Sequence, residues 1–158
     1  MAIRKIVTMG DEVLRKKSRP VVNFNEKLWQ LLDDMKDTMN KAEGVGLAAV
    51  QVGVLRRVIV IDVGDGLMEL INPEIIEVSG EQEGQEGCLS VPGRWGIVKR
   101  PNYVKLRAQN RKGQWKLYEG TELKARAFCH EIDHLDGTLY VDVETKELTA
   151  DEFLAERN

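Results

Sequence analysis

Apolar residues recur every three or four positions between Asn25 and Glu43, the spacing that places them on one face of an α-helix. The apolar positions of this stretch are Leu28, Leu31, Leu32, Met35 and Met39. Asn23 followed by Glu26 has the spacing of an N-cap with its capping-box acid, and Gly44 supplies a stop. The pattern therefore predicts a long amphipathic helix over residues 25–43.

The middle of the chain changes to β-branched runs and to alternation with a period of two, which is typical of strands. The stretches with this pattern are residues 57–63, 67–72, 73–78, 103–108 and 115–118. Residues 64–66 and 110–113 have the composition of turns that join neighbouring strands. We therefore expect the middle of the chain to be mostly antiparallel sheet.

A second helical pattern begins at Gly120 and ends at Gly137, which is placed as a stop. One stripe of this helix carries Leu123, Ala127, His130 and His134. Leu123 and Ala127 are expected to bury this face against the sheet. Such packing would hold both imidazoles at a fixed height beside the sheet.

A capping box near the end of the chain is the last local signal. Thr149 and Glu152 have its spacing and predict a short C-terminal helix. No repeat, low-complexity segment or linker interrupts the pattern, so residues 1–158 are predicted to form a single domain. The predicted class is α+β, a mostly antiparallel sheet packed around a central helix that carries both histidines.

Composition narrows the classes of function. The chain has 158 residues, of which 42% are hydrophobic and 31% charged, as in an ordinary globular protein. A net charge of -3 leaves no overall basic footprint, so we expect no nucleic-acid readout. No apolar run approaches the ~20 residues of a membrane span, so no membrane partner is expected. We expect a cytoplasmic protein with Cys88 and Cys129 reduced.

The only two histidines of the chain lie in one segment, His130-Glu131-Ile132-Asp133-His134. Residues four apart on a helix share a face, so both imidazoles can bind one metal ion while Glu131 acts as general base. A surface helix with two solvated histidines is the alternative interpretation. The concentration of both histidines in this segment favours a metal-dependent hydrolase.

A catalytic site of this type has three protein ligands, so one is still to be found. Tyr140 occupies the place of the third histidine in one large class of metalloprotease, which disfavours that class. Cys88 lies in a glycine-rich segment and is our predicted third ligand, because thiolates bind divalent metals strongly. Cys129 is rotated by about 100° from its neighbour His130 and is expected to pack in the core. A metallopeptidase with a late acidic ligand stays open, with candidates Glu144, Glu147 and Glu152.

Three segments, in order, resemble the motifs of the peptide deformylases. These are Gly44-Val45-Gly46-Leu47-Ala48-Ala49-Val50-Gln51, then Glu86-Gly87-Cys88-Leu89-Ser90, then the histidine segment described above. The likeness runs over essentially the whole chain. It implies a hydrolase that removes the N-formyl group from the N-terminal methionine of newly synthesised proteins and releases formate.

The resemblance also implies roles for individual residues. Cys88, His130 and His134 would bind one divalent metal ion, with Fe²⁺ native and Zn²⁺, Ni²⁺ or Co²⁺ able to occupy the site. Metal-activated hydroxide would attack the formyl carbon, with Glu131 as general acid/base. The side-chain amide of Gln51 and the backbone N–H of Leu89 would form the oxyanion hole.

The substrate cleft follows from the same resemblance. The residues that it implies for this cleft are Gly44, Val45, Gly46, Glu86 and Gly87, with Leu123 and Ala127 shaping the methionine pocket. The expected partners are N-formylmethionyl peptides of nascent chains at the ribosome, and the expected state is a monomer. Arg126 is interpreted as solvated on the back of the helix, and Asp133 as a candidate partner of Arg100.

A binding protein of this shape without catalysis is a third hypothesis. It is disfavoured because Glu131 has no use in a site that only holds a metal.

Overall fold

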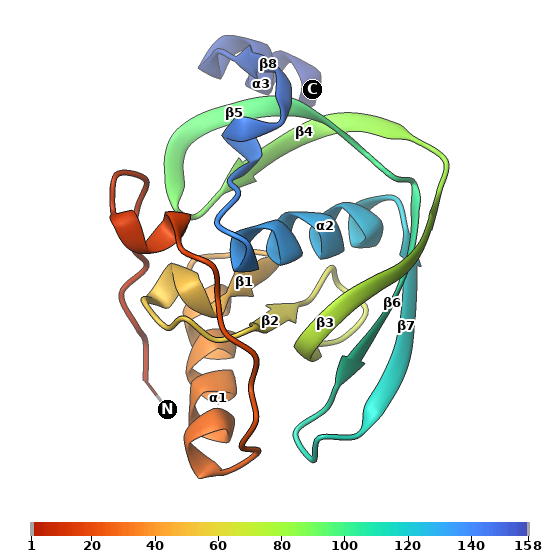
Figure 1. Ribbon diagram of the computed structural model, residues 1–158. Helices are drawn as coiled ribbons and strands as arrows, with labels where there is room; N and C mark the ends of the chain where they lie inside the picture. Colours follow the sequence, from red (N-terminus) through yellow and green to blue (C-terminus); the bar gives the residue numbers. More distant parts are fainter. Residues whose placement is uncertain (1, 158) are drawn as a thin grey trace.

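The structure is a computed structural model that describes residues 2–157, and side chains up to Phe153. Two antiparallel sheets surround a helix, α2, that runs through the middle of the molecule (Figure 1). The larger sheet has the order β1-β2-β3-β6-β7, with bounds Gly46–Ala48, Val58–Ile61, Met68–Ser79, Tyr103–Gln109 and Trp115–Thr121. The smaller has the order β4-β5-β8, with bounds Gln82–Cys88, Val91–Arg100 and Glu144–Leu148. The predicted α+β class with mostly antiparallel sheet is confirmed.

Helix α1 spans Glu26–Lys41, within the predicted range, but its cap differs. The side chain of Asn25 accepts the backbone N–H of Leu28 at 3.3 Å, and Asn25 has extended backbone dihedrals. The prediction of Asn23 as N-cap is wrong, because the chain enters the helix two residues later. The apolar face of α1 packs on β1 and β2 in a core that includes Leu32, Met35 and Val60.

Strand β3 joins two stretches that were predicted separately, 67–72 and 73–78. The pairing with β6 shifts between Ile71 and Glu74, and Asn72 adopts a φ of 53° at this shift. The Asn72 side chain bonds the backbone N–H and carbonyl of Val21, at 2.8 and 2.9 Å, which ties the N-terminal segment to the sheet. The irregularity thus bends one long strand instead of ending it.

Helix α2 spans Leu123–Leu135 and is buried on most of its surface. Ala125, Phe128 and Ile132 pack on the larger sheet, together with Cys129 as predicted. Leu123 is 51% exposed, so the expectation that it is buried against the sheet is wrong: it lies in the first turn of the helix, at the edge of the core. Within the described residues, no helix combines the length and apolarity that crossing a membrane requires.

The remaining helices are short. The 3-10 helices are Glu12–Arg15, Ala49–Val52 and Tyr140–Asp142, labelled η1, η2 and η3. Helix α3 spans Ala150–Arg157 and begins with the predicted capping box, in which Thr149 Oγ1 accepts the N–H of Glu152 and Glu152 accepts the N–H of Thr149. The strands β4, β5 and β8 were not individually predicted from the sequence pattern.

Candidate active site

The three predicted metal ligands come together from two elements. Cys88 ends β4, and His130 and His134 lie one turn apart on α2. One donor atom from each lies within 4.8 Å of the other two, and Cys88 Sγ lies 3.3 Å from His134 Nε2. A tetrahedral ion with standard metal–sulfur and metal–nitrogen bonds would set such a pair about 3.6 Å apart. The donor set and its spacing therefore fit one divalent metal ion.

An irregularity in β4 directs Cys88 towards the helix. Glu86 pairs with Gly96 and Cys88 with Val91, so the register shifts between these two pairs. A bulge of this kind changes the direction in which the following side chain points. It places the Cys88 thiol beside α2, which no helical or alternating pattern in the sequence indicates.

The Glu86 carboxylate orients His130. Glu86 Oε1 lies 2.8 Å from His130 Nδ1, and Arg100 donates to both carboxylate oxygens at 2.9 Å. Burial raises the pKa of Glu86, but the hydrogen bonds from Arg100 and His130 outweigh it and hold this pKa well below its usual range. The ionised Glu86 accepts the Nδ1–H of His130, which leaves Nε2 as the atom that could bind a metal.

Arg126 is a second cation on Glu86, and its interpretation as a solvated residue is wrong. Its Nη1 lies 2.6 Å from Glu86 Oε2, and the residue is only 7% exposed. The guanidinium also donates to the carbonyls of Gly84 and Val98, across the smaller sheet. The sequence pattern missed this residue because its partners lie on β4 and β5, not on its own helix.

Asp133 lies on the solvent side of the same network. Its carboxylate accepts a hydrogen bond from Arg100 at 2.8 Å, so the suggested pairing is confirmed. Arg100, at the end of β5, thereby joins this strand to α2.

Glu131 points into the site with little solvent around it. It is 4% exposed, and burial raises its pKa to about 7. Its Oε1 has no hydrogen-bond partner within the described part of the chain. A Cβ on Gly46 would lie 2.6 Å from Oε2, so a glycine is required there for this carboxylate position. A carboxyl group with a pKa near neutrality can both take and give a proton.

Burial lowers the pKa of His134 well below its usual value, which keeps this imidazole neutral. A neutral imidazole has the lone pair that a metal ion binds. The Nδ1 of His134 has no hydrogen-bond partner among the described residues.

Gln51 has a fixed amide orientation beside Cys88. Its Oε1 accepts the N–H of Ala48 at 2.9 Å, and its Nε2 donates to Ser90 Oγ at 3.1 Å and faces Cys88 Sγ at 3.5 Å. The residue is almost fully buried in η2. Its N–H group is therefore held beside the three candidate ligands.

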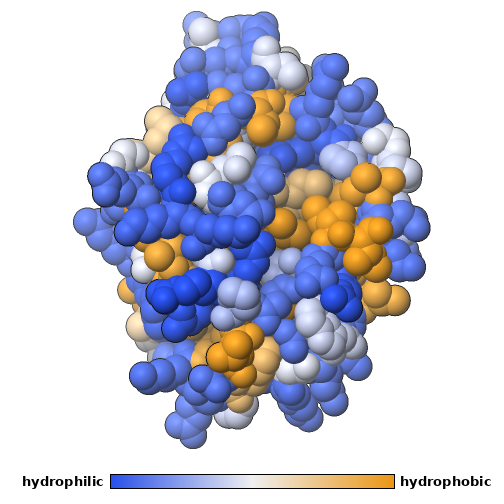
Figure 2. Space-filling view, viewed as in Figure 1, coloured by the Kyte–Doolittle hydropathy of each residue, from blue (hydrophilic) through white to orange (hydrophobic). Residues whose placement is uncertain are grey.

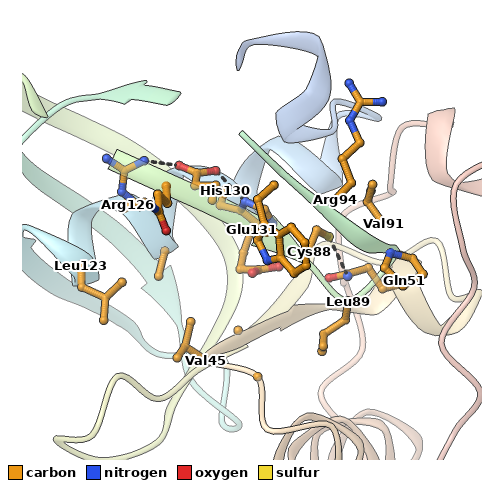
Figure 3. A pocket seen from close by; sticks show the side chains of 18 of the residues that line it. Val45, Gln51, Cys88, Leu89, Val91, Arg94, Leu123, Arg126, His130 and Glu131 are labelled. Carbon is orange, nitrogen blue, oxygen red and sulfur yellow. Dashed lines mark hydrogen bonds and ion pairs between the residues drawn. The ribbon is translucent and has the colours of Figure 1, made fainter. Parts of the chain in front are cut away.

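A cavity of about 420 Å³ opens onto these residues. In Figure 3, Cys88, His130 and Glu131 lie together in its middle, with Leu123 and Val45 towards one side and Arg94 on the other. Every residue that the resemblance placed in the cleft lines it: Gly44, Val45, Gly46, Glu86, Gly87, Leu123 and Ala127. Gln51 and Leu89 also line it. Lining residues that sequence reasoning did not identify are Gln85, Val91, Pro92, Gly93, Arg94, Trp95 and Arg126.

The late acidic residues do not join the metal-binding group. Glu144 and Glu147 pair with Arg94, at 2.6 and 3.4 Å, and Glu152 pairs with Lys146 at 2.6 Å. Among the described residues, the group that could hold an ion includes none of the three. A metallopeptidase with a late acidic ligand is therefore not favoured.

The fold and the site together are those of a metal-dependent hydrolase with a His-Glu-x-x-His helix, in which two histidines and one cysteine form a group that could hold the ion. The model of the polypeptide deformylase family matches residues 3–149. The peptide deformylase of Caldicellulosiruptor bescii is 60% identical over 142 residues, which are 90% of this chain and 86% of that relative.

Solved structures of peptide deformylases are also similar to this chain over most of its length. That of peptide deformylase from Thermotoga maritima has a TM-score of 0.90 and 40% identity, covering 92% of this chain and 99% of the other. That of a peptide deformylase from Legionella pneumophila has a TM-score of 0.88 and 44% identity, covering 99% and 92%. The chain belongs to the peptide deformylase family, metal-dependent hydrolases that remove the N-formyl group from nascent peptides.

Proposed function

We propose that Cys88, His130 and His134 bind one divalent metal ion and that Glu131 is the general acid/base of deformylation. The observation that carries this proposal is the meeting of three donor atoms within 4.8 Å beside a buried carboxyl group that has an unpartnered oxygen. When bound, a divalent ion supplies Lewis acidity and lowers the pKa of coordinated water to about 7.

Glu131 accepts a proton from the attacking water and delivers it to the departing methionine amine. Its pKa of about 7 suits both transfers, because neither protonation state is strongly favoured at neutral pH. The amide N–H of Gln51 and the backbone N–H of Leu89 donate to the oxygen of the formyl group as negative charge develops there. Preorganised donors stabilise this charge because they need no reorientation during the reaction.

The cavity supplies substrate recognition. Leu123, Ala127 and Val45 offer apolar contacts to the methionine side chain. Gly44 and Gly46 let the backbone approach the substrate closely, since neither carries a side chain. Glu86 and Gly87 line the cavity from β4.

Fe²⁺ is the proposed native ion, with Zn²⁺, Ni²⁺ and Co²⁺ able to occupy the same ligands. Two imidazoles and one thiolate suit all four, so metal supply decides the occupant. Metal analysis of anaerobically purified protein tests this proposal: iron should be the main metal, and activity should fall on exposure to air. Zinc as the main metal, with air-stable activity, would contradict it.

Two variants test the roles of the residues. Cys88→Ala should lose metal, whereas Glu131→Ala should keep its metal and lose turnover of formyl-Met-Ala-Ser by at least about 100-fold. Metal content and formate release are measured on the same anaerobic samples. If Cys88→Ala keeps its metal while changes at Glu144 or Glu147 remove it, the late acidic ligand is correct instead.

The proposed setting is the cytoplasm, where the monomer acts on nascent chains at the ribosome. Support comes from the nascent-peptide substrate of the family. Light scattering should give a mass near 17.9 kDa, and a dimer mass would contradict the monomer.

A further inference from the structure

A second cavity, here called the N-terminal groove, lies between residues 19–25, the first half of α1 and the loop 53–56. Its volume is about 940 Å³. None of its lining residues lines the active-site cavity. Its charged lining residues are Arg4, Arg19, Lys27 and Arg56, and no acidic residue of the described chain lines it.

Arg19 and Arg56 differ from the other arginines. Every other arginine with a described side chain pairs with a carboxylate, whereas within the described residues these two form no such ion pair. They lie side by side, because their backbones form an isolated parallel β-bridge. Both are exposed, and the side chain of Arg56 donates a hydrogen bond to the carbonyl of its neighbour Leu55 at 3.4 Å. Two adjacent guanidinium groups thus face the solvent without an anion.

Three lysines lie near the pair Arg19 and Arg56, in the groove or in the chain segment before it. Lys27 lies at the start of α1, where the helix dipole adds positive potential, and Lys16 and Lys17 precede Arg19 in the chain. The segment before α1 crosses the front of the molecule in Figure 1, and this face carries hydrophilic residues together with hydrophobic patches in Figure 2. Glu26 precedes Lys27 and Asp34 pairs with Arg4, so the cations of the groove without a carboxylate partner are Arg19 and Arg56 together with Lys27, within the described residues.

We propose that the N-terminal groove binds the phosphate backbone of RNA. The planar fork of arginine fits phosphate oxygens with two hydrogen bonds, and two neighbouring forks fit successive phosphates. A run of cations that continues beyond the cavity fits a polymer better than a single anion. The lining has no aromatic side chain, so bases have no stacking platform and the contact reads no sequence.

A peptide that adds as a further strand fits this groove less well. Strand addition needs main-chain hydrogen bonds to an exposed edge. Here the Val21 N–H and carbonyl are bonded to the side chain of Asn72, and the Arg19 N–H and carbonyl are bonded to the loop at Leu55 and Arg57. The edge is therefore occupied, while the arginine side chains remain available.

Fluorescence anisotropy with a labelled RNA hairpin tests the inference on the metal-loaded protein. The dissociation constant should lie between about 1 and 100 µM and should weaken steeply between about 50 and 200 mM salt. The variant R19Q/R56Q should bind RNA roughly 10-fold more weakly. The slope of the logarithm of its binding constant against the logarithm of the salt concentration should be smaller in magnitude by about 1.5, because two phosphate contacts are lost. R19K/R56K, which keeps both charges, should retain most of the binding.

The matched control is K41Q/K116Q, which removes two exposed charges, one at the C-terminal end of α1 and one on β7, neither of which lines the groove. Equal losses in R19Q/R56Q and in this control would overturn the site, as would no binding by the unchanged protein. Displacement of RNA by an acidic peptide of equal charge at the same concentration would assign the groove to a peptide. Displacement by micromolar inorganic phosphate would assign it to a small anion.

Hydrolysis of formyl-Met-Ala-Ser by R19Q/R56Q should be unchanged, because neither residue lines the active-site cavity. This readout separates the RNA site from the proposed catalytic roles. A fall in RNA binding with unchanged hydrolysis supports the inference, and a parallel fall in both would contradict it.

Discussion

At the scale of single residues, the Glu86 carboxylate connects the candidate metal ligand His130 to the fold. One guanidinium from β5, one from α2 and the imidazole of His130 all contact it. The sequence predicted that the candidate ligands and Glu131 belong to one site because these residues lie in short motifs with fixed spacing, and the structure brings them together. It did not predict the contact from Arg126, because that contact joins α2 to a strand 40 residues away in the chain.

Replacing Arg126 with Leu tests this connection. The change leaves buried Glu86 with Arg100 as its guanidinium partner and removes one charged hydrogen bond, so stability should fall by about 2 kcal/mol. Metal affinity should fall roughly 10-fold, because His130 loses part of its orientation. Urea unfolding and a chelator competition measure the two effects. Arg126→Lys, which keeps a charge, should lose less of both. A Leu variant with unchanged metal affinity would contradict the connection.

At the scale of elements, the helices were more predictable than the smaller sheet. The apolar periodicity of α1 and α2 is strong, and both were located from the sequence within a few residues. Strand β4 consists mainly of Gln, Glu and Gly, which have low strand propensity. It is a strand because β5, which follows it after two residues, pairs with it along its length, and this pairing does not show in the residue types of β4 itself.

The N-terminus of α1 gives a test at this scale. Asn25→Ala should destabilise the protein by about 1 kcal/mol, because it removes the side-chain oxygen that accepts the N–H of Leu28. Asn23→Ala is the matched control and should cost no more than about 0.5 kcal/mol, the usual effect of a surface substitution. Urea denaturation measures both. Equal losses in the two variants would show that the cap has been assigned to the wrong asparagine.

At the scale of the whole molecule, the first residues are attached to α1 by Asp34. Its carboxylate accepts hydrogen bonds from the Ala2 N–H, the Arg4 guanidinium and the Gln30 amide. Burial raises the pKa of Asp34, but these three hydrogen bonds outweigh it and lower the pKa below the ordinary value of 3.8. The attachment therefore depends on an ionised carboxylate.

This dependence predicts how stability changes with pH. A carboxyl group with a lowered folded pKa stabilises the fold fully above its unfolded pKa, and this contribution is lost as the pH falls through the folded pKa. Asp34→Asn should therefore cost about 1 to 2 kcal/mol at pH 7, and less as the pH falls below about 4. The free energy of unfolding of the unchanged protein and of Asp34→Asn, measured with urea from pH 7 to pH 2.5, checks the prediction. A difference that stays constant down to pH 2.5 would contradict it.

The central claim concerns the ligands of the metal, and X-ray absorption at the metal edge tests it most directly. Anaerobically purified, metal-loaded protein should show one sulfur ligand at about 2.3 Å and two imidazole nitrogens at about 2.0 to 2.1 Å when the ion is zinc. Those distances would place Cys88, His130 and His134 on one ion. A shell of nitrogen and oxygen without sulfur would contradict the account.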